Sequence, residues 1–465
     1  MDITHSTGRD TPDEQKATPA DRSPAYLDAL YRRIGWKLMP VLLVAQVLAY
    51  LDRVNVGAAK LQMAGELGLS DTVYGLGAGL FFVGYFLFEV PSNLLLHRVG
   101  ARVWIARIMV TWGIVSAAAA WIHSPGTFYL QRLLLGVAEA GFFPGIVLYL
   151  TYWFPAHRRG RMTTLFMSAT AVAGIVGNTL SGWIMTHLDG FGALSGWQWT
   201  FVIEGLPTVG VGLAVHYLLP SRPTDARWLS PEETDAVLRS LEVDAGHAAD
   251  ARRAPRLPTS EMALLTTIYF LLLVGLYGIG FWLPTLVQET GLTKLSWIGL
   301  CSAIPYLIAV LVMNIGARRA DRGGNWVAYV AGGACVASAG FVVSALFSGV
   351  LPAVIAGLSL AAAGTLTALP LFWHLPTMRL TGAAAAAGIA TINCFGNLAG
   401  FAGPIVFGWL RDRHHDAMAP TLLLALSASA AMALTVAYRR YRRIEARQAE
   451  GARRIRAEHR LFGLD

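Results

Sequence analysis

The segment Gln131–Gly145, QRLLLGVAEAGFFPG, places two charged residues inside an apolar run that extends to Tyr152. Arg132 and Glu139 are seven residues apart, and at about 100° per residue they fall on nearly the same face of a helix. A charge at the bilayer centre costs about 2.5–3.5 kcal/mol on insertion scales, so such residues usually face a polar interior. The pair therefore predicts either an ion pair that locks two helices together or a site for substrate or protons.

The composition is that of a protein that crosses a membrane many times. Of the 465 residues, 55% are hydrophobic and only 14% are charged, and long apolar runs recur along the chain. Residues 1–32 are polar and lack the pattern of a cleavable signal peptide, so we expect a disordered cytoplasmic tail there. Three cysteines in apolar runs offer no disulfide framework, and we expect no metal site.

The basic residues are distributed asymmetrically. The net charge is +8, which in a soluble protein would raise the question of nucleic-acid binding. If the N-terminus is cytoplasmic, all but six of the 37 Lys and Arg residues lie in segments that face the cytoplasm. This distribution follows the positive-inside rule, so we expect both termini in the cytoplasm and no nucleic-acid partner. The basic tail at 439–465 is then expected to contact the lipid bilayer.

Twelve segments are long enough to cross about 30 Å of hydrocarbon, which takes about 20 residues each. They fall near 35–57, 72–96, 103–122, 126–152, 162–187, 198–219, 261–286, 296–316, 326–347, 351–375, 383–410 and 420–438. The polar stretch 220–259 divides them into two six-helix halves, residues 33–219 and 260–438, and is expected to be a cytoplasmic linker. Within it, Ser230–Glu242 carries the start signal of a short surface helix. The predicted fold class is an all-α membrane protein.

The two halves share a short basic turn at equivalent points, which indicates an internal repeat. The first copy is NLLLHRVGAR at Asn93–Arg102, and the second is ARRADRGG at Ala317–Gly324. Both resemble the G-x-L-x-D-R-x-G-R/K loop of the major facilitator superfamily, although the first copy has Asn93 and His97 where that loop has Gly and Asp. The resemblance implies a gating role for Arg98, Gly100, Arg102, Asp321 and Arg322.

Further polar residues lie inside the predicted spans. Asp52 stands beside Arg53 near the end of the first span, and because neighbouring helical side chains diverge by about 100°, the two can serve different partners. Contact with lipid headgroups at a helix end would explain the same pair. In the second span, Tyr85 and Glu89 share a face, and Pro91 frees backbone carbonyls beside them. Glu89 is therefore an additional candidate for a polar site.

Several longer blocks resemble the anion:cation symporter family of the major facilitator superfamily, and in particular its tartrate, sugar-acid and aromatic-acid permeases. In the first half they are YLDRVNV from Tyr50, GYFLFEVPSNLLLHRVGAR from Gly84, RLLLGVAEAGFFPG from Arg132 and YLTYWFPAHRRGR from Tyr149. In the second half they are FWLPTL from Phe281 and FWHLPTMRLTGAAAAAGIATINCFGNLAGFAGP from Phe372. The likeness covers about residues 33–438. It implies the major facilitator fold, with 12 transmembrane helices in two pseudo-symmetric halves, in a bacterial cytoplasmic membrane.

Where residues match, the family's roles carry over to this chain. The resemblance implies that Asp52 and Glu139 bind the coupling protons and that Arg132 partners Glu139. It implies that Arg53 binds a substrate carboxylate, with further substrate contacts from Tyr50, Tyr85, Trp373, Asn393 and, one turn further along, Asn397. Tyr277 and His374 match no position of the family pattern and are candidates by residue type alone.

The residues and the resemblance together predict proton-coupled import of a small organic anion, such as tartrate or a sugar acid, by alternating access. An arginine fork matches a carboxylate, and tyrosine and asparagine side chains can bond hydroxyls. Trp373 could also stack on an aromatic acid of the hydroxyphenylacetate or phthalate kind. An anion exchanger or efflux carrier without proton coupling, or a ligand sensor on the same scaffold, would use the same cavity.

Other classes of protein are not expected. No nucleophile–base or metal-ligand constellation stands out within the spans, which argues against an enzyme. No G-x-x-x-x-G-K-[ST] loop is present, which argues against an ATP-driven pump. We expect a monomer that uses the proton gradient and no cofactor.

Overall fold

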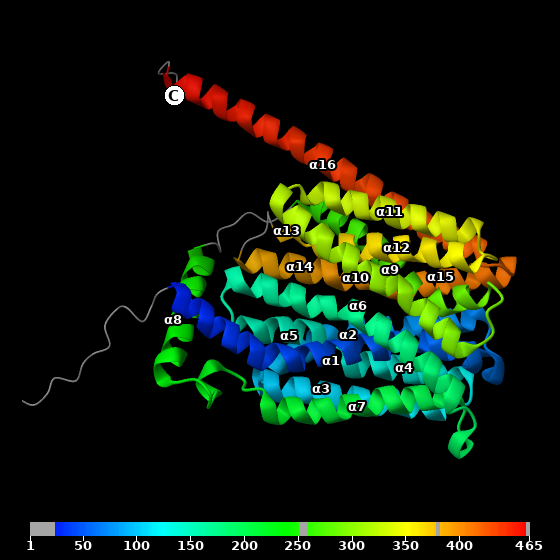
Figure 1. The fold of residues 1–465 in the computed structure, drawn as a ribbon. Coiled ribbons are helices and arrows are strands. Elements are labelled where there is room, and N and C mark those ends of the chain that lie inside the picture. The colour runs from blue at the N-terminus through cyan, green and yellow to red at the C-terminus, as the bar shows by residue number, and fades with distance from the viewer. Residues whose placement is uncertain (1–23, 251–257, 378–381, 462–465) are drawn as a thin grey trace, which may run out of the picture.

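The computed structural model describes residues 24–250, 258–377 and 382–461 (Figure 1). Within these ranges the regular secondary structure is entirely helical. Among the described residues, twelve helical segments are long and apolar enough to cross a membrane, which is the number that the sequence predicts. The expected all-α membrane fold is confirmed.

The first half supplies six crossings from seven α-helices, because the fourth crossing is made of two helices. The helices are α1 (Pro24–Leu67), α2 (Asp71–Val99), α3 (Ala101–Ala117), α4 (Pro125–Glu139), α5 (Phe142–Thr151), α6 (Ala156–His187) and α7 (Gly196–Leu218). Short 3-10 turns η2 (Ala118–Trp121) and η3 (Phe191–Ala193) lie between them. The linker contains η4 (Pro223–Asp225) and α8 (Pro231–Asp250), which covers the stretch where the sequence predicts a helix.

The second half supplies the other six crossings. Its helices are α9 (Thr259–Gln288), α10 (Leu295–Gly323), α11 (Trp326–Leu346), α12 (Leu351–Phe372), α13 (His374–Thr377), α14 (Gly382–Asn397), α15 (Ala399–His414) and α16 (Met418–Leu461). α12 and α13 share the tenth crossing, and α14 and α15 share the eleventh.

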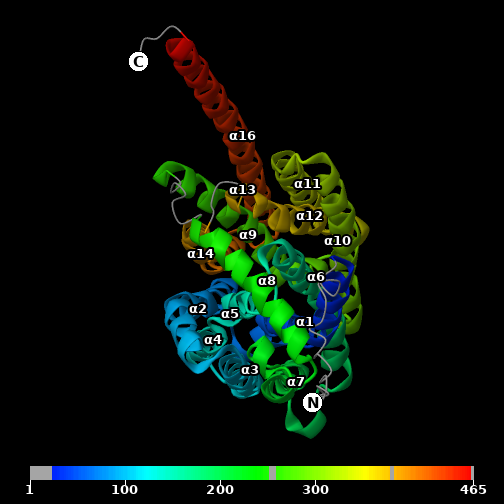
Figure 2. The same cartoon turned by 90° about the vertical axis from the view of Figure 1, so that its left-hand side faces the viewer.

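The two ends of the bundle differ. α8 lies across one end, where α1 begins and α16 leaves the bundle (Figure 1). We term this the linker end, and the opposite one the far end. Seen from the linker end in Figure 2, α2, α3, α4, α5 and α7 lie to one side of the bundle, and α9, α11 and α12 lie to the other.

Two helices are longer than the sequence predicts. α1 begins at Pro24, inside the stretch 1–32 that we expected to be disordered, and the burial of Tyr31 explains the earlier start. α16 continues as one helix to Leu461, beyond the expected end of its span at 438. The extension is rich in Arg, Glu and Ala, which are good helix formers.

The two halves meet closely at the far end, where α2 packs along α15. A Cβ atom on Gly75 of α2 would lie only 2.2 Å from the backbone oxygen of Pro404 on α15. The absence of a side chain at Gly75 therefore lets the two backbones touch.

Charged residues also join the halves at the far end. Arg411 of α15 lies 2.6 Å from the Asp71 carboxylate at the start of α2, and its Nε donates to Glu289 at 2.7 Å. Lys60 of α1 bonds the same Asp71 carboxylate at 2.5 Å. Asp412 accepts hydrogen bonds from the first two backbone N–H groups of α2, at 3.0 and 2.8 Å, and so caps a helix of the opposite half. We term Lys60, Asp71, Glu289, Arg411 and Asp412 the far-end charge cluster.

Candidate functional site

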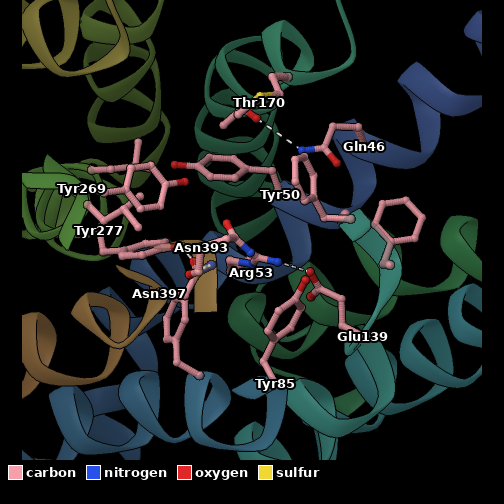
Figure 3. A pocket seen from close by; sticks show the side chains of 17 residues that line it. Gln46, Tyr50, Arg53, Tyr85, Glu139, Thr170, Tyr269, Tyr277, Asn393 and Asn397 are labelled. Atoms are coloured by element: carbon pink, nitrogen blue, oxygen red, sulfur yellow. Dashed lines mark hydrogen bonds and ion pairs between the residues drawn. The ribbon is translucent and has the colours of Figure 1, made fainter. Parts of the chain in front are cut away.

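A cavity of about 100 Å³ is lined by residues of both halves (Figure 3). It is lined by α1, α2, α4, α5 and α6 of the first half and by α9 and α14 of the second. Its polar lining residues are Gln46, Tyr50, Arg53, Tyr85, Glu139, Thr170, Tyr269, Tyr277, Asn393 and Asn397. Six of these are residues that the sequence assigns to substrate or protons: Tyr50, Arg53, Tyr85, Glu139, Asn393 and Asn397.

Arg53 and Glu139 form an ion pair in the cavity wall. The side chain of Glu139 is 1% exposed and that of Arg53 is 18% exposed, so the pair is largely removed from water while Arg53 still reaches the cavity. Figure 3 shows the guanidinium near the centre of the labelled residues, directed toward Glu139. A ligand carboxylate in this cavity would compete with Glu139 for the same guanidinium.

An interruption of the fourth transmembrane helix places Glu139 at the cavity. α4 ends at Glu139, Gly141 has a φ of 86°, and α5 begins at Phe142. A Cβ on Gly141 would lie 2.3 Å from the Ser92 hydroxyl oxygen, so this position requires glycine both for its left-handed backbone and for space. At the C-terminus of α4 the helix dipole is unfavourable for an anion, which makes the carboxylate of Glu139 depend on Arg53.

Aromatic rings enclose the guanidinium of Arg53. Its Cζ lies 5.0 Å from the ring centre of Phe81 and 5.5 Å from that of Tyr85. The buried Tyr50 hydroxyl lies at the cavity beside Tyr306. The rings stabilise a cation and exclude water, and the hydroxyl of Tyr50 can bond a ligand.

Hydrogen bonds order the wall that the second half supplies. The Tyr277 hydroxyl donates to Asn397 Oδ1 at 2.8 Å, and Asn397 Nδ2 donates to the backbone oxygen of Asn393 at 2.9 Å. Asn393 Nδ2 in turn donates to Glu89 of the first half at 3.4 Å. Tyr277 thus belongs to the cavity, and Glu89 supports it from behind Asn393.

Asp52 does not line the cavity, although the sequence places it in the proton site. It is fully buried inside the first half, where its carboxylate accepts hydrogen bonds from Trp112 Nε1 and Ser116 Oγ, both at 2.7 Å. Thr208 Oγ1 donates a third at 3.0 Å. Because adjacent side chains on α1 diverge, Arg53 faces the cavity and Asp52 faces away from it.

Arg132 is not bonded to Glu139, contrary to the expected pairing. The two residues share a face of α4, but at about 1.5 Å per residue they are about 10 Å apart along the axis, too far for a direct ion pair. The guanidinium of Arg132 is fully buried, and its Nη2 donates to the backbone oxygen of Arg53 at 3.3 Å. Its Nε and Nη1 have no hydrogen-bond partner within the described part of the chain.

Trp373 and His374 lie outside the cavity lining. The Trp373 ring packs on Tyr269 with ring centres 4.8 Å apart, and Tyr269 itself lines the cavity. The His374 ring stacks on Trp326, with ring centres 3.8 Å apart. The expected direct contact of Trp373 with a ligand is thus replaced by support of Tyr269.

The two basic turns lie at the linker end of α2 and of α10. Gly100 ends α2 with a φ of 95°, Arg98 and Arg322 are exposed, and Arg102 is half-buried. The side chain of Asp321 lies outside those that the structure describes. The gating role of these turns stays a prediction.

Several lining residues and one buried acid are not among the residues predicted from the sequence. Gln46 Nε2 donates to Thr170 Oγ1 at 3.3 Å in the cavity wall. Tyr269 was not a candidate, although it lies eight residues, about two turns, before the candidate Tyr277 on α9, a spacing that places both on one face. Glu204 of α7 is 1% exposed and does not line the cavity. In the sequence it is a single acidic residue within an apolar span, and that pattern could have marked it as a buried polar residue.

Comparison with known families decides the identity of the fold. Residues 42–404 match the family model described as Major Facilitator Superfamily. The chain belongs to this superfamily. It is therefore a multi-pass membrane transporter and not an enzyme. The family predicted from the sequence is confirmed.

Individual proteins that are similar to this chain are also named as transporters. The chain is 44% identical over 383 residues to the "Putative tartrate transporter" of Agrobacterium vitis, an alignment that covers 82% of this chain and 85% of that protein. It is 41% identical over 388 residues to the "Quinolone resistance transporter" of Acinetobacter baumannii, covering 82% of this chain and 88% of that protein. The fold is similar to that of the xylose transporter XylE from E. coli, with a TM-score of 0.70 at 15% identity, covering 87% and 97% of the two chains.

Proposed function

We propose that the protein imports a small organic anion, such as tartrate or a sugar acid, together with protons and by alternating access. The observation that carries this proposal is the Arg53–Glu139 ion pair in the wall of the cavity between the halves. The relative named as a tartrate transporter supports an organic acid as the substrate class. Tyrosine hydroxyls and asparagine amides around the cavity supply bonds for the substrate's hydroxyl groups.

Coupling follows from the charges of the pair. With the cavity empty, Arg53 and Glu139 neutralise each other. When a proton neutralises Glu139, the guanidinium becomes available to the substrate carboxylate, and the cavity loaded with a monoanion is again neutral. With only the proton or only the anion bound, the cavity carries a net charge, which is costly in the membrane. Proton and substrate therefore promote each other's binding, and the two half-loaded forms are disfavoured.

We place the protein in a bacterial cytoplasmic membrane, as a monomer, with both termini in the cytoplasm. The concentration of Lys and Arg in the linker-end segments supports this orientation. The far end then faces outward, and its charge cluster and the α2–α15 contact separate the cavity from the outside in this conformation.

Two further functions have an observation in their favour. Phe82, Phe142 and Phe143 line the cavity beside Arg53, which favours an aromatic acid as the substrate. The relative named as a resistance transporter favours an exchanger or efflux carrier. Both alternatives keep Arg53 as the residue that binds the anion.

Uptake into proteoliposomes separates these functions. The labelled panel contains tartrate, hexonate and hexarate sugar acids, 4-hydroxyphenylacetate and phthalate, each with and without an inward proton gradient. Saturable uptake of one class that a protonophore abolishes is the expected result. Uptake that ignores the gradient and is stimulated by internal anion would instead establish exchange.

A further inference from the structure

Seven side chains with polar atoms form a buried cluster inside the first half, apart from the cavity. They come from α1, α3, α6 and α7, and we term them the first-half polar cluster: Asp52, Asn55, Trp112, Ser116, Ser181, Glu204 and Thr208. Glu204 and Thr208 are one turn apart on α7, and Thr208 bonds Asp52. Glu204 therefore faces α1 together with Thr208.

The two acids of this cluster have different surroundings. Asp52 accepts hydrogen bonds on both carboxylate oxygens, from three donors in all. Glu204 receives one hydrogen bond, from Ser181 Oγ to Oε1 at 2.7 Å. Its Oε2 is buried without a hydrogen-bond partner in the part of the chain that the structure describes. Three donors stabilise a charged carboxylate, whereas one donor and a bare oxygen stabilise the neutral acid.

The groups around Glu204 favour its neutral form. The buried arginine of the cavity wall, Arg53, is already paired with Glu139. The groups that face Glu204 are Asp52 and Asn55 of α1 and Ser181 of α6, so no described basic side chain would compensate a further anion. Burying an unpaired carboxylate is strongly unfavourable.

Asn55 of α1 faces Glu204 with a buried amide. The amide can accept from the O–H of a neutral Glu204 or donate to an ionised one, so it provides a partner for Glu204 in either state.

We propose that Glu204 binds a proton in this conformation and is a proton-coupling acid in addition to Glu139. The part of this inference that concerns coupling rests on the proposed symport. The part that concerns the bound proton does not.

Infrared spectroscopy of the purified protein near neutral pH tests the bound proton without any substrate. A Glu204→Gln variant keeps an oxygen that can accept from Ser181, and it should lose a carboxylic-acid carbonyl band that the wild type shows. Glu232→Gln, at a fully exposed acid of α8, should keep that band. In a second variant, Asn55→Ala, the band should move to higher frequency because the acceptor of the O–H is gone. A Glu204→Gln spectrum identical to wild type, or no shift in Asn55→Ala, would overturn the proposal.

Proton counting tests the coupling, with labelled tartrate as the probe and a pH dye inside proteoliposomes. Glu204→Gln should keep the exchange of internal for external tartrate and lose one proton per tartrate taken up. A wild type that takes up tartrate without protons would refute the proposed symport. A wild type that takes up protons, with an unchanged proton count in Glu204→Gln, would refute the role of Glu204 alone.

Discussion

Replacing Arg411 by alanine should open the far end of the transporter. Arg411 bonds two carboxylates, Asp71 of the first half and Glu289 of the second, and these side chains are only 18–25% exposed. A charge-assisted hydrogen bond is worth about 1.5–3 kcal/mol when buried. Partial exposure, and the continued bond of Lys60 to Asp71, reduce the expected loss to about 1–3 kcal/mol. That loss corresponds to about a 5- to 150-fold change in the ratio of closed to open far ends.

Cysteine labelling from the far-end face measures this opening. The reporter is Thr170→Cys in the cavity wall, in a background where Cys301, Cys335 and Cys394 are replaced by Ser. A membrane-impermeant maleimide is added on the face opposite the termini. The background protein should react slowly, and Arg411→Ala should react faster by a factor within the range above.

Arg413→Ala is the matched control. Arg413 lies two residues away near the end of the same helix, where its guanidinium lies 5.6 Å from the Trp409 ring centre. It should label at the background rate. Equal rates for Arg411→Ala, Arg413→Ala and the background would refute the view that the far-end charge cluster holds this side closed.

Three other changes probe the same account. Gly75→Ala places a Cβ 2.2 Å from the Pro404 backbone oxygen and should disfavour the closed far end by about 1–3 kcal/mol, raising Thr170→Cys labelling as Arg411→Ala does. Gly210→Ala, where the added Cβ meets nothing within 4 Å, should leave that labelling unchanged. Arg53→Lys replaces the planar guanidinium, which can bond a carboxylate through two N–H groups, and should cost about 1.5–3 kcal/mol of binding free energy. That loss raises the KM for the transported acid by about tenfold or more. An unchanged KM in uptake assays would contradict the proposal that Arg53 binds the substrate carboxylate. Asp52→Asn puts an amide N–H₂ group among three hydrogen-bond donors and should lower the free energy of unfolding by about 1–3 kcal/mol. Glu204→Gln should not lower it. Thermal melts in detergent compare the two variants, and equal melting temperatures would count against different protonation states of Asp52 and Glu204.

The sequence predicted the fold because its signals are local and repeated. Twelve apolar runs, a polar linker and a one-sided distribution of Lys and Arg are each visible without any tertiary information. The position of Arg53 and Glu139 in the cavity was also predictable, since a charged residue in an apolar span must face a polar interior. The longer α1 and α16 were not predicted, because polar stretches can be helical beyond the hydrocarbon.

The surroundings of Asp52 and Arg132 depend on geometry that a sequence does not contain. Asp52 and Arg53 are adjacent, and only packing decides which of the two faces the cavity. Arg132 and Glu139 were correctly placed on one face, but the break at Gly141 and the reach of Arg53 from another helix decide the partner of Glu139.

The far-end charge cluster was beyond prediction for the same reason. Asp71 and Arg411 are separated by 340 residues along the chain and meet only when the two halves pack. On the sequence alone, Arg411 belongs to a basic segment at a helix end, which is ordinary at a membrane surface.

The most direct test of the account is a comparison of two modes of transport in Glu139→Gln. Proteoliposomes are assayed with the panel acid that the wild type takes up, first for exchange of internal for external acid and then for accumulation driven by an inward proton gradient. Glutamine mimics protonated Glu139 and leaves Arg53 free for the substrate. Exchange should therefore persist, whereas accumulation driven by the proton gradient should fall because Glu139 no longer carries its proton. Glu232→Gln should retain both modes. Full proton-driven accumulation by Glu139→Gln would contradict the central claim that protonation of Glu139 frees Arg53 for the substrate.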